Sequence, residues 1–349
     1  MAGCVTRDEQ EALGLLARRD VLRLGAGTCG AILSALAPGC SGRVSLCRQV
    51  PPNPFTEAGK PVLIVVKGDD LSAMLRAGIN ALGGLDRLLP FGSEALLKAN
   101  FIAPQPYPVT TPPDVIAAVA AELGRAGFGR STLFEAHGSE LVWEFSPHSI
   151  MRKLGVVDRM QSDGIAVLAG DFLNRDQFRL VHNPRWSMAS PVAVHRALYD
   201  AGVVISLPVL KRHGGARLSC ALKLHFGSVA MTDRLVAHKR GNQGDLEYFD
   251  HCLVQYADAV RPQLNIVDAR AILARGGPTL GGRGEVVRGI NRMILCGDMV
   301  ATDAYCARLM AEHDPTFSVD MIARQLKLAA AMGLGTASLD AARIVEVST

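Results

Sequence analysis

Basic side chains and imidazoles gather in one short stretch of the chain, and these residue types can bind a small anion and move protons on it. Lys211 and His213 follow an apolar run at 203–207, and Lys223 and His225 come shortly after them. Cations this close together repel one another unless an anion or a metal ion lies between them. The stretch therefore indicates a ligand site, with a solvated basic loop as the plain alternative.

The role of each residue in this stretch depends on its local structure. If residues 219–226 form a helix, Lys223 shares a face with Ser219 and points away from His225. We take His213, Lys211 and Lys223 as candidate catalytic residues, and His213 and His225 as candidate metal ligands, because imidazole is the commonest metal-binding side chain.

Further ligand-binding candidates follow other apolar runs. Lys98 and Asn100 end one such run, where a buried lysine and amide would be costly without partners. Asp268 follows the run at 264–267, and Arg275 and Arg283 flank a glycine-rich loop in which two arginines could hold a phosphate or carboxylate. The alternative for Lys98 and Asn100 is a strand edge that runs into solvent. The alternative for the glycine-rich loop is a flexible turn without a ligand.

Three acidic residues and one more histidine complete the candidates. Asp298 is placed to cap a helix, and Asp303, one turn further on, is kept among the ligand-binding residues. Glu135 and His137 end another expected strand, and their side chains are of the types used in metal binding and proton transfer. A purely structural pair is the alternative.

The elements that must position these residues are visible from about residue 61 onward. Short β-branched runs alternate with longer amphipathic ones, which predicts a three-layer α/β fold: a mainly parallel sheet with helices on both faces. Ligands in such sheets bind beyond the carboxyl ends of the strands, where the candidate residues fall. The expected strands are 61–66, 95–101, 132–136, 165–169, 203–207, 264–267, 292–296 and 342–347, and the expected helices are 70–82, 114–126, 192–201, 246–260, 301–311 and 319–331.

The N-terminal segment has the order of an export signal. Arg18 and Arg19 precede a weakly apolar run at 24–37, and Pro38-Gly39-Cys40 follows it, which resembles the twin-arginine type of signal. We expect residues 1–40 to be this signal, 41–60 a linker and 61–349 one α/β domain, in an exported protein of the periplasm or cell envelope. A retained membrane helix and a lipid on Cys40 are alternatives; either would make this segment the protein's contact with a membrane.

Composition excludes several classes of protein. The chain has 349 residues, a formal charge of +4 and 5% aromatic residues, and its basic residues are scattered, so nucleic acid is not an expected partner. The eight cysteines lack the CxxC spacing of iron–sulfur and zinc sites. Gly25–Gly30 matches GxGxxG, but an acidic residue at the required distance is missing, so a dinucleotide site is not expected.

Taken in order, these motifs resemble the domain of unknown function 362 family from about residue 62 to the end. The pairing of Lys211-Arg-His213 with Ala221-Leu-Lys223 is the most specific element of the resemblance. The family's usual Lys-Pro-Asn and Lys-Asn stand here as Lys98-Ala-Asn100 and Lys223-Leu-His225, so the resemblance does not extend to His225. The other motifs are Pro208 to Lys211, Ile266 to Asp268, Gly277 to Gly281 and Asp298 to Asp303.

The resemblance implies a bacterial or archaeal protein whose reaction is unassigned, in a family often exported by the twin-arginine route and sometimes fused to iron–sulfur modules. The lysine–histidine arrangement also looks distantly like the nickel-pincer lactate racemase family. We expect a small carboxylate or phosphate ligand neutralised by Lys98, Lys211 and Lys223 and oriented by Asn100. His213 would serve as an acid, a base or the ligand of a divalent metal. The alternative is a non-catalytic accessory protein for an exported redox or iron–sulfur partner.

Overall fold

The structure is a computed structural model that describes residues 44–136, 146–170, 175–281 and 283–349. The described residues belong to one compact unit, which runs from Arg43 to Thr349. The expected export signal, the GxGxxG match and His137 lie outside the described residues.

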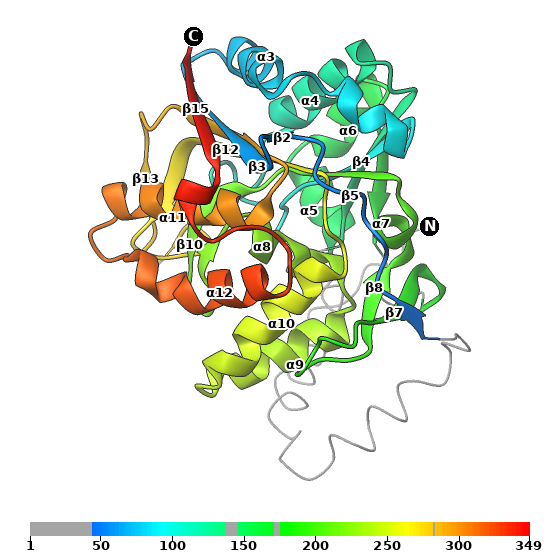
Figure 1. The fold of residues 1–349 in the computed structure, drawn as a ribbon, viewed down its shortest axis with the longest axis vertical. Helices are drawn as coiled ribbons and strands as arrows, with labels where there is room; N and C mark the ends of the chain where they lie inside the picture. Colours follow the sequence, from blue (N-terminus) through cyan, green and yellow to red (C-terminus); the bar gives the residue numbers. More distant parts are fainter. Residues whose placement is uncertain (1–43, 137–145, 171–174, 282) are drawn as a thin grey trace, which may run out of the picture. The chain divides into compact units, whose positions relative to one another are not determined.

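A large, mostly parallel β-sheet organises this α/β fold (Figure 1). Its main strands lie in the order β15-β3-β14-β12-β9-β4-β5-β6. Strand β14 runs antiparallel to both of its neighbours, whereas the other adjacent pairs along this order are parallel. The strands are β1 (Ser45–Leu46), β2 (Thr56–Glu57), β3 (Lys60–Lys67), β4 (Glu94–Lys98), β5 (Arg130–Glu135), β6 (Ala166–Ala169), β7 (Phe178–His182), β8 (Val192–His195), β9 (Val203–Ser206), β10 (Val209–His213), β11 (Arg217–Ser219), β12 (Leu264–Ala274), β13 (Glu285–Val287), β14 (Arg292–Cys296) and β15 (Arg343–Ser348).

Side chains of β3 alternate between two hydrophobic clusters. Val62, Ile64 and Val66 belong to the cluster that includes α3 and α4, whereas Leu63 and Val65 belong to the cluster that includes α10 and α11. This alternation follows from the two-residue period of a strand buried on both sides. The helices are α3 (Leu71–Leu82), α4 (Pro113–Arg125), α5 (Pro147–Lys153), α6 (Val156–Ser162), α7 (Arg196–Asp200), α8 (Ala221–Leu224), α9 (Met231–Asn242), α10 (Leu246–Asp258), α11 (Met299–His313) and α12 (Ala323–Ala331).

Helix α3 begins where the sequence predicts and packs closely on the sheet. The Asp70 carboxylate accepts the backbone N–H of Ala73 and so caps the helix. A Cβ atom on Gly78 would lie only 2.7 Å from Leu295 Cδ1 of β14. Glycine at this position therefore allows the helix to approach the strand.

Two expectations from the sequence need correction. The helix expected at 192–201 is wrong in its first half, because β-branched Val192 and Val194 pair with β7 and the helix starts only at Arg196. Strand β12 continues to Ala274, so Asp268 lies inside the strand and not after it. The basic loop that stood as the alternative for this stretch does not form, because Lys211 lies on strand β10.

Part of the stretch expected as a linker packs onto the domain. β1 pairs with β7, β2 pairs with β3, and Phe55 is fully buried. Residues 45–57 therefore contribute to the fold, because a buried phenylalanine and two strand pairings fix them against it.

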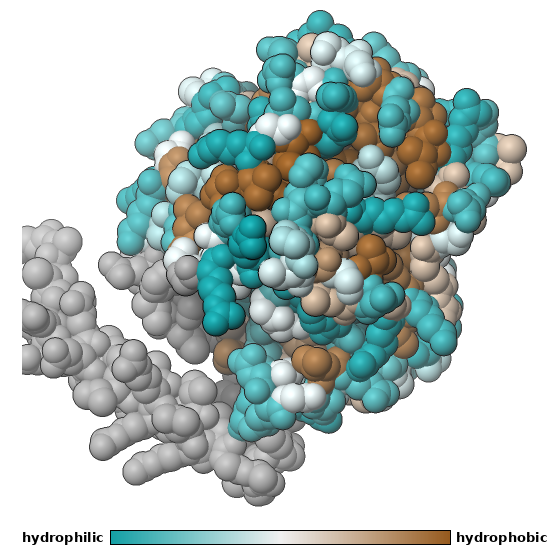
Figure 2. Space-filling model, turned by 90° about the vertical axis from the view of Figure 1, so that its left-hand side faces the viewer, coloured by the Kyte–Doolittle hydropathy of each residue, from teal (hydrophilic) through white to brown (hydrophobic). Residues whose placement is uncertain are grey.

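The surface in Figure 2 is mixed in character. Hydrophobic areas, shown in brown, are crossed by hydrophilic side chains on this face. Among the described residues, we find no helix that is both long and apolar enough to span a bilayer.

Candidate functional site

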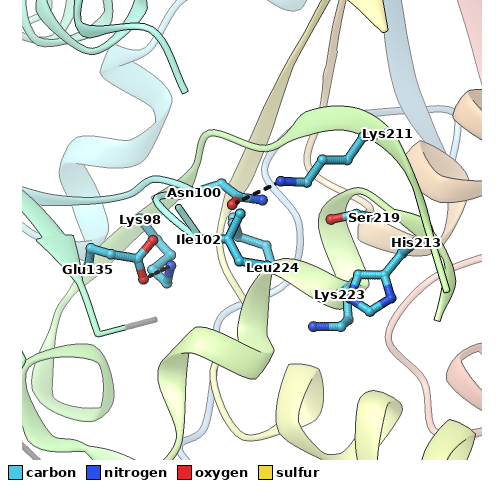
Figure 3. A pocket seen from close by; sticks show the side chains of 9 residues that line it. All are labelled: Lys98, Asn100, Ile102, Glu135, Lys211, His213, Ser219, Lys223 and Leu224. Carbon is cyan, nitrogen blue, oxygen red and sulfur yellow. Dashed lines mark hydrogen bonds and ion pairs between the residues drawn. The ribbon is translucent and has the colours of Figure 1, made fainter. Parts of the chain in front are cut away.

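A small polar pocket lies where β4, β5 and β10 end, closed on the other side by α8 (Figure 3). Strands β4 and β5 are adjacent and parallel, so their carboxyl ends meet at one edge of the sheet. The free space in the pocket is about 10 Å³, room for about one water molecule. The pocket is lined by Lys98, Asn100, Ile102, Glu135, Lys211, His213, Ser219, Lys223 and Leu224.

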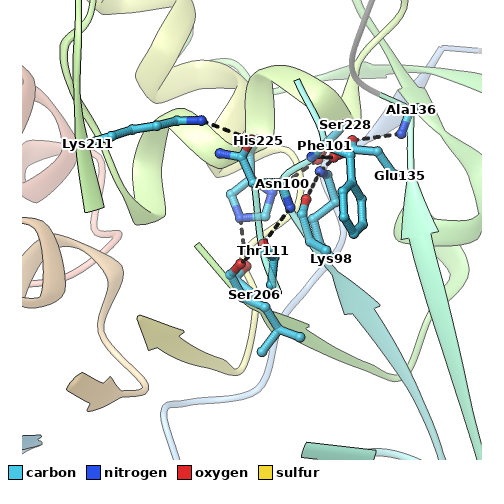
Figure 4. A network of polar contacts seen from close by, with 12 residues as sticks. Lys98, Asn100, Phe101, Thr111, Glu135, Ala136, Ser206, Lys211, His225 and Ser228 are labelled. Carbon is cyan, nitrogen blue, oxygen red and sulfur yellow. Dashed lines mark hydrogen bonds and ion pairs between the residues drawn. The ribbon is translucent and has the colours of Figure 1, made fainter. Parts of the chain in front are cut away.

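Lys98 and Glu135 form a buried ion pair at one end of the pocket (Figures 3 and 4). Lys98 Nζ lies 2.8 Å from Glu135 Oε1 and also donates to the carbonyl oxygen of Ala99 at 2.6 Å. Glu135 also accepts the backbone N–H groups of Phe101 and Ala136. Burial lowers the pKa of Lys98, and the charge of Glu135 opposes that shift. This pair is well supplied with partners on both sides.

Lys211 reaches the pocket from β10. Its ammonium group donates to the carbonyl oxygen of Val109 and lies 3.4 Å from Asn100 Oδ1. The backbone N–H of Asn100 donates to the Thr111 hydroxyl, which fixes the backbone from which the Asn100 side chain extends. Burial lowers the pKa of Lys211 to about 7, with Glu135 acting in the opposite direction. Lys211 therefore changes charge near neutral pH.

Lys223 is positioned by a short helix, α8, that a carboxylate holds in place. Asp303 Oδ1 and Oδ2 accept the backbone N–H groups of Ala221 and Leu222 at 2.7 and 3.2 Å. The Lys223 ammonium group lies 4.0 Å from the centre of the Phe226 ring, a cation–π contact. Burial, followed by the positive charges of Lys211, Arg234 and Lys98, lowers the pKa of Lys223 well below its usual value.

Replacing Asp303 by alanine should loosen α8 and with it Lys223. The change leaves two buried backbone N–H groups without their acceptor, which costs about 1–3 kcal/mol in the free energy of unfolding. Urea unfolding of Asp303→Ala beside Asp303→Asn measures this cost. The asparagine variant keeps one carbonyl oxygen and should lose less; equal stability of both variants and the wild type would contradict the capping role.

The contacts of His213 define which of its nitrogens carries the proton. Its Nδ1 accepts the backbone N–H of Ala216 at 3.2 Å. Burial lowers the pKa of His213 well below its usual value, with the Lys223 charge as the second cause. A neutral imidazole whose Nδ1 accepts must carry its proton on Nε2. His213 therefore offers the pocket a hydrogen-bond donor.

His225 is not among the residues that line the pocket, and Figure 4 shows it in the neighbouring network of polar contacts. Its two ring nitrogens contact the hydroxyl groups of Ser206 and Ser228 at 3.2 and 3.1 Å. Burial lowers the pKa of His225 to about 3, and the Lys98 charge adds to this. The ring is thus a neutral, buried part of the hydrogen-bond network.

This arrangement does not fit a metal shared by the two histidines. A metal on His213 Nε2 would need the lone pair of a nitrogen that here carries the proton. Within the four ranges that the structure covers, His, Cys, Asp and Glu side chains form no group of three or more suited to a metal.

The remaining ligand-binding candidates lie outside the pocket. Asp268 accepts from the Tyr107 hydroxyl and pairs with Arg270, whereas Arg275 pairs with Glu285. Arg283 is exposed, and Asp303 supports α8 from behind. The structure thus brings together Lys98, Asn100, Lys211, His213 and Lys223, and it separates the other candidates from them.

Two residues at or near the site, Glu135 and Arg234, are not placed there by the sequence analysis. Glu135 stood out only beside His137, and its place opposite Lys98 depends on the pairing of β4 with β5. Arg234, buried on α9, adds positive charge near Lys223 and carries no motif that would mark it.

Comparison with other proteins gives a family but no reaction. Thylakoid-associated protein sll1697 of Synechocystis is 28% identical over 226 residues, which cover 62% of this chain and 64% of that protein. The chain thus spans less than two thirds of this relative's length.

Among solved structures, the lactate racemase apoprotein from Thermoanaerobacterium thermosaccharolyticum matches with a TM-score of 0.43 and 10% identity, over 66% of this chain and 55% of that one. A protein from Thermotoga maritima matches with a TM-score of 0.37 and 11% identity, over 68% of this chain and 53% of that one. At these scores neither structure assigns chemistry to this chain.

One family profile matches residues 95–308, a range that holds every residue lining the pocket. Since this match covers more than half of the sequence, the chain belongs to the family described as "Domain of unknown function (DUF362)".

Proposed function

We propose that this protein binds a small carboxylate or phosphate in the pocket formed by Lys98, Asn100, Lys211, His213 and Lys223. The observation that carries this function is the charge of the pocket: three buried lysines face a single carboxylate, Glu135. When all three are protonated, the pocket holds an excess of positive charge in surroundings of low dielectric. A bound anion would offset that charge.

Each lining residue has a role that follows from its contacts. Lys211 neutralises the anion, Lys223 adds charge when it is protonated, and Lys98 contributes charge while it remains paired with Glu135. Asn100 accepts a hydrogen bond from Lys211 through Oδ1. Its side-chain N–H groups would then donate to the ligand and orient it. His213 donates from Nε2 to a ligand oxygen and is placed to shuttle a proton.

We also propose that the protein is exported, through the twin-arginine-like segment at residues 1–40. Support comes from the order of Arg18-Arg19, apolar run and small residues, and from the relative in Synechocystis that is named as a thylakoid-associated protein. Twin-arginine substrates cross membranes after folding.

Loss of binding in a Lys211→Met variant tests the anion site. Titration calorimetry of the full chain with sulfate and with lactate should show a tenfold to hundredfold loss of affinity, because a charge-assisted hydrogen bond contributes about 1.5–3 kcal/mol. Methionine has a similar length and no charge, so the fold should persist. Lys327→Met, on the exposed side of α12, is the matched control. Unchanged affinity in Lys211→Met would overturn the proposed function.

A further inference from the structure

The three lysines of the pocket differ in what their ammonium groups contact. Lys98 pairs with Glu135, and Lys211 donates to Val109 and Asn100. For Lys223, the described residues provide a ring face and no hydrogen-bond acceptor: its contact is with Phe226. Lys223 is nevertheless only 5% exposed and lines the pocket. It is the lysine that can move toward a ligand without breaking a hydrogen bond.

The surroundings of Lys223 favour an uncharged amine, which is the nucleophilic form. Burial contributes most, and the charges that face the side chain come from four elements: Lys211 on β10, Arg234 on α9, Lys98 on β4 and Glu135 on β5. Three of these charges are positive and lower its pKa, and the carboxylate raises it. A desolvated lysine beside other cations is the arrangement that activates lysine as a nucleophile.

We propose that Lys223 forms an imine with the carbonyl carbon of a 2-oxo acid bound in this pocket, an inference that rests on the anion binding proposed above. The ligand class follows from the two functions that the lysines offer. Lys211 and Asn100 bind the carboxylate, and the Lys223 amine adds to the adjacent carbonyl carbon.

The step balances without an oxidant or a reductant. The amine nitrogen forms a bond to the carbonyl carbon, and the carbonyl oxygen becomes a hydroxyl group. Both amine protons then leave with that oxygen as water, and a C=N bond remains. His213, with its proton on Nε2, is placed to donate a hydrogen bond to the oxygen as it changes.

The size of the pocket requires Lys223 to move when a ligand enters. The free space of about 10 Å³ is too small for a molecule of several non-hydrogen atoms. Rotation of Lys223 off the Phe226 ring opens space, and it breaks only the contact with that ring.

Reductive trapping tests the proposal on the full chain. The protein is incubated at neutral pH with pyruvate or 2-oxoglutarate and sodium cyanoborohydride, and the modified lysine is located by peptide mass spectrometry. We expect one reduced adduct on Lys223, no adduct in Lys223→Arg, and full labelling in the control Lys327→Arg. Calorimetry with lactate, which has the carboxylate but no carbonyl group, is run in parallel.

The outcomes separate this proposal from the proposed function. Lactate binding without an adduct, or an adduct on Lys98 or Lys211 instead, overturns the imine at Lys223 and leaves anion binding intact. Failure to bind both lactate and sulfate overturns both. Because the labelled position is read from the wild-type protein, the test holds even if Lys223→Arg folds poorly.

Discussion

A Glu135→Gln variant should lose about 3–5 kcal/mol of unfolding free energy, the usual cost of breaking a buried ion pair. Glu135 and Lys98 are both fully buried, and Lys98 Nζ lies 2.8 Å from Glu135 Oε1. The glutamine oxygen can still accept one backbone N–H, from Phe101 or Ala136, but its amide cannot neutralise the Lys98 ammonium group. The loss therefore comes mainly from an uncompensated charge. Urea unfolding followed by circular dichroism measures it.

A double-mutant cycle separates the ion pair from the backbone contacts of Glu135. Lys98→Met removes the positive charge that Glu135→Gln leaves without a counter-charge. The double variant should therefore lose less unfolding free energy than the sum of the two single losses. If the single losses simply add, the pair makes no specific contribution and the assigned contact is contradicted. Glu94→Gln, an exposed residue at the other end of β4, is the matched control and should change stability by less than about 0.5 kcal/mol.

Much of the fold can be predicted from local pattern. The β-branched run of β3, the start of α3 beside Asp70 and the Asp298 cap of α11 all appear where the sequence indicates them, because burial and capping depend largely on nearby residues. Residues 192–195 show the limit. Their strand depends on pairing with β7, which no local periodicity reveals.

The candidate site was predictable in part for the same reason. Lys98, Lys211 and Lys223 stand out because lysines are rarely placed in apolar runs without partners. That the three lysines meet in one pocket depends on how β4, β5 and β10 pair with their neighbours, which the sequence alone does not give. Arg275 and Arg283 also stand out in sequence, yet neither lines the pocket, and Arg275 pairs with Glu285. The glycines between the two arginines do not tell a ligand-binding loop from an ordinary loop.

The histidines show why residue type is a weak guide to metal binding. His213 and His225 are close in sequence, but β11 and α8 lie between them, and the two rings have different hydrogen-bond partners. His213 uses Nδ1 to accept from Ala216, and His225 contacts two serines. Only the hydrogen-bond partners fix which nitrogen could donate a lone pair; Ala216 and Ser228 are local partners, and Ser206 comes from another strand, β9.

Stability should rise with pH above neutrality, the opposite of a protein held by ordinary surface lysines. The pKa of Lys211 is lowered by burial from 10.5 in an exposed lysine to about 7 in the folded protein. Between these values the unfolded chain holds a proton that the folded protein lacks, so unfolding takes up a proton and a rise in pH opposes it. One proton corresponds to about 1.4 kcal/mol per pH unit. Lys223, whose pKa burial also lowers, adds to this slope, so urea unfolding at pH 7, 8 and 9 should show a slope of at least this size.

The lysine responsible is identified by substitution. Lys211→Met should lower the slope by the contribution of one proton and leave the contribution of Lys223, whose pKa burial also lowers, whereas Lys327→Met, which changes an exposed lysine, should leave the slope as it is. A slope that persists unchanged in Lys211→Met would show that Lys211 remains protonated in the folded protein. Sulfate, whose charge is constant over this range, extends the argument to the ligand. A bound anion favours the protonated lysine, so sulfate should stabilise the protein more at pH 7 than at pH 9. Equal stabilisation at both pH values would mean that sulfate binds without the buried lysines.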